Sequence, residues 1–320
     1  MPLSPLSPRG TTPSIKALKD WAVFCSLNKT ENSPPNRGNA KCKVMPVDSE
    51  LLATLRDLTP ENNFSELLSL PKTGFSIGAI VELACVHKHC IPAVQALLNE
   101  WEKSSPLLRE AFTVFDHTKY PSRNNMWSTR DVEFFPIVGE NWADEIKFHP
   151  FESRFCKAAK TAGFGDMADA LTGALFEMAD NVVQHSGADL AGAAPGLIGY
   201  YVCDGHVAFA VGDAGRGVLA SLKENPAWAA LTDSKAGLLA IVQQSASRRV
   251  GFADGEGFKQ VFRSLVDFNG IVEMHSYDGR IKLTQTPAGR EAVSQFTGSW
   301  PGFQLSVNCS LTKTEEKIIT

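Results

Sequence analysis

The sequence contains no run of 18 or more apolar residues, the length that a membrane-spanning helix requires. Prolines recur within residues 1–8, where a signal peptide would need a continuous apolar core. The seven cysteines are odd in number and scattered from Cys25 to Cys309, unlike the framework of a small disulfide-rich domain. These absences predict a cytoplasmic protein with reduced thiols and no membrane association.

An excess of charge of one sign is also lacking. Lys and Arg together number 31 and Asp and Glu 35, so the net charge is −4 and the isoelectric point is about 6.0. Neither end of the chain carries a long basic run, and we therefore expect no nucleic acid as a partner. The chain does have length and apolar content, because 320 residues with 43% hydrophobic side chains suffice for two packed domains.

The N-terminal half divides into two parts of different composition. Residues 1–43 are rich in Pro, Ser, Asn and Lys, which predicts a disordered or flexible segment. In residues 44–149 the apolar pattern predicts helices over residues 75–89 and 91–101 and a strand over residues 132–138. We expect this part to be a mostly helical domain of unknown type.

Four possible metal ligands lie close together in this half: Cys85, His87, His89 and Cys90. Zinc is bound by such residue types. On a helix, however, Cys85 and His89 share a face while His87 points elsewhere, and no second Cys/His pair follows at a zinc-motif spacing. The pattern favours core cysteines with polar histidines, and metal binding stays open as the alternative.

Helix-like and strand-like segments alternate in residues 150–312, as in a two-layer α/β domain, and a polar tail follows at 313–320. Helices are expected over residues 151–162, 166–184, 219–222, 234–247 and 257–268, and strands over 197–203, 206–211, 271–276, 280–286 and 304–311. The pair Asp204-Gly205 is a two-residue turn signal, so the first two strands should form a hairpin.

The helix expected over residues 166–184 carries two polar residues, Glu177 and Asn181, four positions apart. This spacing puts a carboxylate and a carboxamide on one helix face. The opposite face should enter the core through Leu171, Leu175, Met178 and Val182. Two solvated polar residues would produce the same pattern, so the pair alone identifies no site.

Two glycine motifs follow. Asp213 comes directly after a strand-like run and is followed by Gly215 and Gly217, while Gly255 and Gly257 open a further helical pattern. Free amides at a helix start favour phosphate. A turn cap and an ordinary loop are the alternatives for each motif alone. In this order, after a polar helix face, the motifs suit a nucleotide-triphosphate pocket.

These three motifs resemble the N-box and the two glycine boxes of the GHKL ATPase superfamily, which includes gyrase B subunits, heat-shock chaperones, sensor histidine kinases and anti-sigma-factor kinases. The resemblance covers about residues 150–311. It implies a Bergerat-type fold, a mixed sheet with helices on one face and ATP on that side. Phe258, Lys259 and Phe303 depart from the pattern, since Leu, Gly and Thr are common there.

The resemblance also implies roles at the base end of the nucleotide. Asp213 would accept a hydrogen bond from the adenine amino group. Gly215 and Gly217 would let the backbone approach the base and the sugar.

At the phosphate end, the resemblance implies that Gly255 and Gly257 line the phosphates and that Asn181 offers an amide oxygen to Mg²⁺. Glu177 would orient or deprotonate an attacking water. Residues 219–252, between the two glycine boxes, would form a lid; a rigid helical insertion is the alternative.

Three functions are compatible with this family. The first is Mg²⁺-dependent ATP binding with hydrolysis, or with phosphotransfer to a protein partner in a regulatory role. The second is a nucleotide-gated interaction module without significant turnover. The third, a histidine kinase, is disfavoured because none of the seven histidines is followed by Glu.

Overall fold

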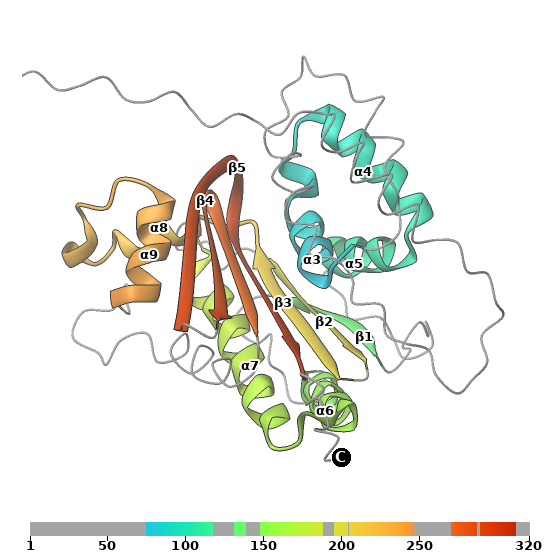
Figure 1. The fold of residues 1–320 in the computed structure, drawn as a ribbon. Helices are drawn as coiled ribbons and strands as arrows, with labels where there is room; N and C mark the ends of the chain where they lie inside the picture. Colours follow the sequence, from blue (N-terminus) through green and yellow to red (C-terminus); the bar gives the residue numbers. More distant parts are fainter. Residues whose placement is uncertain are drawn as a thin grey trace, which may run out of the picture.

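The computed structural model describes residues 75–117, 131–138, 148–187, 195–203, 205–244, 246, 270–286 and 289–311. Within them, one five-stranded sheet lies between two sets of helices (Figure 1). The strands are β1 Val132–Ile137, β2 Gly196–Cys203, β3 His206–Asp213, β4 Ile271–Thr286 and β5 Gly289–Ser310. Their order in the sheet is β1-β2-β3-β5-β4. The α/β class expected from the sequence is therefore observed.

The central hairpin, β2 and β3, forms as the turn signal predicts. The two strands pair antiparallel along their full length. Between them Gly205 has a positive φ of 68°, which two-residue hairpin turns require. Alternate residues of β3 enter opposite faces of the sheet, with Val207, Phe209 and Val211 in one core and Ala208 and Ala210 in the other.

One face is covered by the helices of the C-terminal half. They are α6 Phe148–Ala159, α7 Met167–His185, α8 Gly217–Leu222 and α9 Ser234–Gln244, with a π-helical turn at Lys160–Phe164. Helix α7 presents to the sheet the apolar face that its sequence pattern predicts, and the four expected core residues are all buried: Leu171, Leu175, Met178 and Val182.

The other face is covered by helices from residues 44–149. They are α3 Ile77–Val86, α4 Pro92–Ser104 and α5 Pro106–His117 (Figure 1). Their apolar side chains share a core with the sheet residues Phe134, Leu197 and Ala208. Strand β1 comes from the same part of the chain and pairs with β2 at the edge of the sheet.

Two details of the expected fold need correction. Every neighbouring strand pair in the described sheet is antiparallel, so the sheet is not mixed. Helices cover both of its faces, so the described residues form three layers rather than two. The physical reason for the third layer is that the inner strands carry apolar side chains on both faces, and each face must be buried.

Strands β4 and β5 form a long hairpin that extends beyond β3. The sequence predicts separate strands over residues 271–276 and 280–286. The structure has one strand there, β4, whose pairing with β5 is irregular between Ser276 and Gly279. Tyr277, at this irregularity, has a positive φ of 47°. Helix α9 packs on β4, as Figure 1 shows. None of the described helices is long and apolar enough to cross a membrane.

Candidate functional site

Asp213, the last residue of β3, is the most unusual charged side chain in the described core. It is buried, with 2% of its surface exposed, and forms none of the ion pairs found among the described residues. The Gly215 amide donates to its Oδ1 at 2.7 Å. Burial raises the pKa of Asp213 to about 7, although backbone hydrogen bonds from Gly215 and Phe303 act in the opposite direction.

The backbone after Asp213 turns tightly against the end of helix α7. We call residues 213–217 the Asp213 turn. The Arg216 amide donates to the Ser186 carbonyl at 3.1 Å, and Arg216 Nε donates to the His185 carbonyl at 2.9 Å. The last carbonyl groups of a helix have no hydrogen-bond donor within the helix, and here Arg216 donates to two carbonyls at the end of α7. A Cβ on Gly215 would lie 2.1 Å from the Ser186 oxygen, so this close approach requires glycine.

Two residues of β4, Ser276 and Tyr277, hold the other end of the turn. Ser276 Oγ accepts a hydrogen bond from the Val218 amide at 3.0 Å. The Tyr277 hydroxyl donates to the Gly215 carbonyl at 3.4 Å. Gly217 has a φ of 72°, and a Cβ there would lie 2.7 Å from both Ser276 Oγ and the Tyr277 ring. The sequence motifs did not predict these two β4 residues as part of the site, because they lie about 60 positions further along the chain.

Strand β5 closes the site from the side. Gly302, with a φ of 91°, packs against Asp213 so closely that a Cβ would lie 1.9 Å from the Asp213 carbonyl oxygen. Gln304 Nε2 donates to that same oxygen at 2.7 Å. Phe303, one of the departures from the GHKL pattern noted in the sequence, contributes its backbone amide to the Asp213 carboxylate.

Glu177 and Asn181 lie on helix α7 as their spacing predicts. Glu177 is exposed and Asn181 half-buried, on the side of α7 away from the residues packed on the sheet. A helix rises about 1.5 Å per residue, so Asn181 lies about 8 Å and Glu177 about 14 Å along the axis from Ser186. Moving away from the Asp213 turn, the helix therefore presents first the amide and then the carboxylate.

The expected phosphate loop and part of the expected lid fall outside the described residues. Gly255 and Gly257 belong to that part of the chain. Of the lid, α8 and α9 are described, and both are packed. Leu238 of α9 is fully buried, and a Cβ on Gly279 of β4 would lie 2.4 Å from the Lys235 amide nitrogen. This close packing favours the rigid insertion for residues 234–244.

The Cys/His cluster is dispersed among separate partners. His87 Nδ1 lies 2.7 Å from the Ala84 carbonyl, its ring stacks on Phe112, and Cys90 Sγ donates to the Val86 carbonyl. Across the described residues, no group of three or more His, Cys, Asp or Glu side chains could hold a metal ion. Among the described residues, Cys85, Cys90, Cys156 and Cys309 are free thiols.

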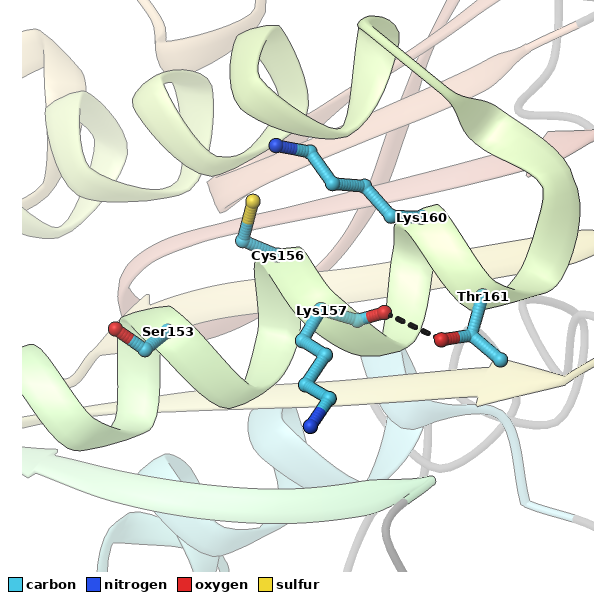
Figure 2. Close-up of a pocket in the computed structure, with 5 residues that line it drawn as sticks. All are labelled: Ser153, Cys156, Lys157, Lys160 and Thr161. Atoms are coloured by element: carbon cyan, nitrogen blue, oxygen red, sulfur yellow. Dashed lines mark hydrogen bonds between the residues drawn. The ribbon is translucent and has the colours of Figure 1, made fainter.

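A surface pocket over α6 and the π-helical turn is lined by Ser153, Cys156, Lys157, Lys160 and Thr161. Figure 2 shows that the two lysine side chains point in different directions. Lys160 is paired with Asp169 at 2.8 Å. The lysines of this pocket therefore do not converge on a common point, as a phosphate site would require.

Comparisons with known proteins add no relative. No family model matches the chain, and no significant match was found among curated proteins or solved structures. The functional argument therefore depends on the geometry around Asp213.

Proposed function

We propose that this chain is an ATP-binding protein of the GHKL type with a Bergerat-like core, and that Asp213 is its base-binding group. The observation that carries the proposal is a buried carboxylate with no cationic partner among the described residues. Burying such a group costs free energy, and residues with strongly shifted pKa values gather at functional sites. A ligand that donates to Asp213 would offset this cost.

The adenine amino group is the donor that fits. Asp213 would accept its hydrogen bond, while Gly215 and Gly217 let the turn that carries Asp213 pack closely against Ser186, Ser276 and Tyr277. Guanine presents a carbonyl oxygen at the same place, which leaves the carboxylate unpaired and penalises GTP. Two sides of this end are built by rigid elements, α7 and the β4–β5 hairpin, which supports a pre-formed base site.

The order of side chains along α7 supports a nucleotide that runs from the Asp213 turn toward Glu177. Asn181 would offer one amide oxygen to Mg²⁺, with phosphate and water oxygens as further ligands. When bound, ATP would supply the phosphoryl group and Mg²⁺ would neutralise the charge on the phosphate oxygens. Glu177, farthest from the base end, would take up a proton from the attacking water or hydroxyl.

A second candidate is the nucleotide-gated module without significant turnover. It is favoured by the exposure of Glu177, because a general base works best when positioned by neighbouring groups. We place ATP hydrolysis or phosphotransfer to a protein partner in a regulatory role first, since Asn181 and Glu177 follow in order along α7 from the end that contacts the Asp213 turn.

Calorimetric titration of ATP and GTP, with and without Mg²⁺, tests the proposal. We expect ATP to bind and Asp213→Ala to lose most of the affinity while remaining folded. Glu133→Gln is the matched control, because Glu133 is another buried carboxylate but pairs with Arg154 at 2.6 Å on the far edge of the sheet. Equal affinity for ATP and GTP, or unchanged binding by Asp213→Ala, would refute the adenine assignment.

A further inference from the structure

A buried ion pair connects the N-terminal helices to the sheet. Glu82 of helix α3 and His275 of β4 lie 3.0 Å apart, from Oε1 to Nδ1, and both side chains are buried. Glu82 is the only charged residue in α3, whose other residues are mostly buried and apolar. An apolar side chain could replace such a pair without loss of stability, so its presence calls for an additional role.

The hydrogen-bond pattern of His275 fixes how protons are distributed in this pair. His275 Nε2 lies 2.6 Å from the Tyr277 carbonyl oxygen, which can only accept. Nε2 therefore carries a proton. One further proton lies between Nδ1 and the Glu82 carboxyl group, because two acceptors cannot form that contact without it. His275 thus joins Glu82 to the backbone of Tyr277 by two hydrogen bonds.

Tyr277 connects His275 to the Asp213 turn. Its backbone has a positive φ of 47°, a conformation that costs free energy in a residue other than glycine and persists only when its surroundings hold it. The His275 hydrogen bond to its carbonyl is one such support. Its side chain in turn contacts the Gly215 carbonyl and packs where a Gly217 side chain would be. A continuous set of contacts therefore runs from α3 to both glycines.

We propose that Glu82, His275 and Tyr277 form a positioning relay, through which the seating of helix α3 on the sheet sets the geometry of the Asp213 turn. Its effect on ATP affinity depends on the proposed function. Its effect on the order of the turn does not. The competing explanation is that the pair only fixes the register of α3 and that the turn is held by α7 and β5 alone.

Amide hydrogen exchange in the protein without nucleotide separates these explanations. The reporters are the amides of Gly215, Arg216 and Val218, each hydrogen-bonded within the site. Glu82→Ala should raise their exchange rates at least about tenfold. Glu82→Gln, whose side-chain amide can donate to His275 Nδ1 and so keep the contact, should stay close to the wild-type protein.

Two further variants complete the experiment. Tyr277→Phe removes only the hydroxyl contact with the Gly215 carbonyl, so it should increase the exchange rates of the reporter amides. If Glu82→Ala does not fold, this variant tests whether Tyr277 holds the turn. Glu133→Ala, which breaks the ion pair with Arg154 at the opposite edge of the sheet, is the control for general destabilisation. It should leave the reporters unchanged.

ATP titration of the same proteins tests the functional consequence. Weaker binding by Glu82→Ala and Tyr277→Phe, but not by Glu133→Ala, would support the relay. Folded variants with wild-type exchange rates at the turn would overturn the relay, whatever their affinity for ATP. A wild-type protein that binds no ATP would instead overturn the proposed function, while the exchange rates still decide the relay.

Discussion

Gly302 lies against the backbone of Asp213 so closely that a Cβ at position 302 would be 1.9 Å from the Asp213 carbonyl oxygen. The contact joins β5 to the end of β3 at the point where the chain turns toward the glycines. Since Gly302 also has a φ of 91°, both its conformation and its surroundings exclude a side chain. The position of the Asp213 turn therefore depends on this glycine.

Gly302→Ala should both destabilise the protein and weaken ATP binding, because the added methyl group would displace the Asp213 turn. We expect a loss of about 3 kcal/mol or more in the free energy of unfolding, measured by urea denaturation. Gly205→Ala is the matched control, since Gly205 also has a positive φ but open space around it. It should cost only about 1 kcal/mol and leave binding unchanged. Similar effects from the two variants would contradict the close contact.

The stability of the empty protein should fall as pH rises, through the titration of Asp213. Its pKa is raised from 3.8 to about 7 by burial, so the folded state favours the protonated carboxyl group. The resulting stabilisation is complete below pH 3.8 and is lost as pH rises to 7. The difference of about 3 pKa units corresponds to about 4 kcal/mol. Comparing the pH slope of unfolding in the wild-type protein and in Asp213→Asn isolates this group, and identical slopes would show that Asp213 titrates normally.

Discrimination between ATP and GTP should narrow at low pH. Above pH 7 the Asp213 carboxylate accepts from the adenine amino group and offers nothing to guanine. Once protonated, it could donate to the guanine carbonyl, and adenine loses its advantage. We expect the ratio of the two dissociation constants to be smaller at pH 6 than at pH 8. Calorimetry in matched buffers measures it, and a constant ratio would mean that another group selects the base.

Substitutions on α7 should separate chemistry from binding. Glu177→Ala should retain ATP but lose turnover by about 10²–10⁴-fold, as expected for a general base. Asn181→Ala should instead reduce the Mg²⁺ dependence of ATP binding. Release of labelled phosphate, or transfer of label to protein in a lysate, provides the readout. Turnover unaffected by Glu177→Ala would make the nucleotide-gated module the better hypothesis.

Helix α9 should not respond to nucleotide as a mobile lid. It buries Leu238 and Ala240 and approaches Gly279 of β4 with no room for a side chain. Amide exchange in residues 234–244 should therefore be the same with and without a non-hydrolysable ATP analogue. Strong protection of these amides by the analogue would instead restore the lid interpretation for this helix.

Local sequence patterns predicted much of the fold around the site. The apolar stripe of α7 and the hairpin of β2 and β3 follow from periodicity and from one turn signal, and both are present as expected. The apolar pattern also predicted a strand over residues 132–138, and β1 is observed at Val132–Ile137. Such elements are determined by residues a few positions apart, so they can be predicted without knowledge of the rest of the chain.

The tertiary structure decided what surrounds Asp213. Ser276, Tyr277, Gly302 and Gln304 reach the turn from strands 60 to 90 positions away, and no local pattern marks them as neighbours of a glycine motif. Packing also brought α3 onto the second face of the sheet, because apolar residues on both sides of β3 require cover. The sequence specified the polar group and its glycines. Only the packing of distant strands against them buried the carboxylate, and that burial raises its pKa to about 7.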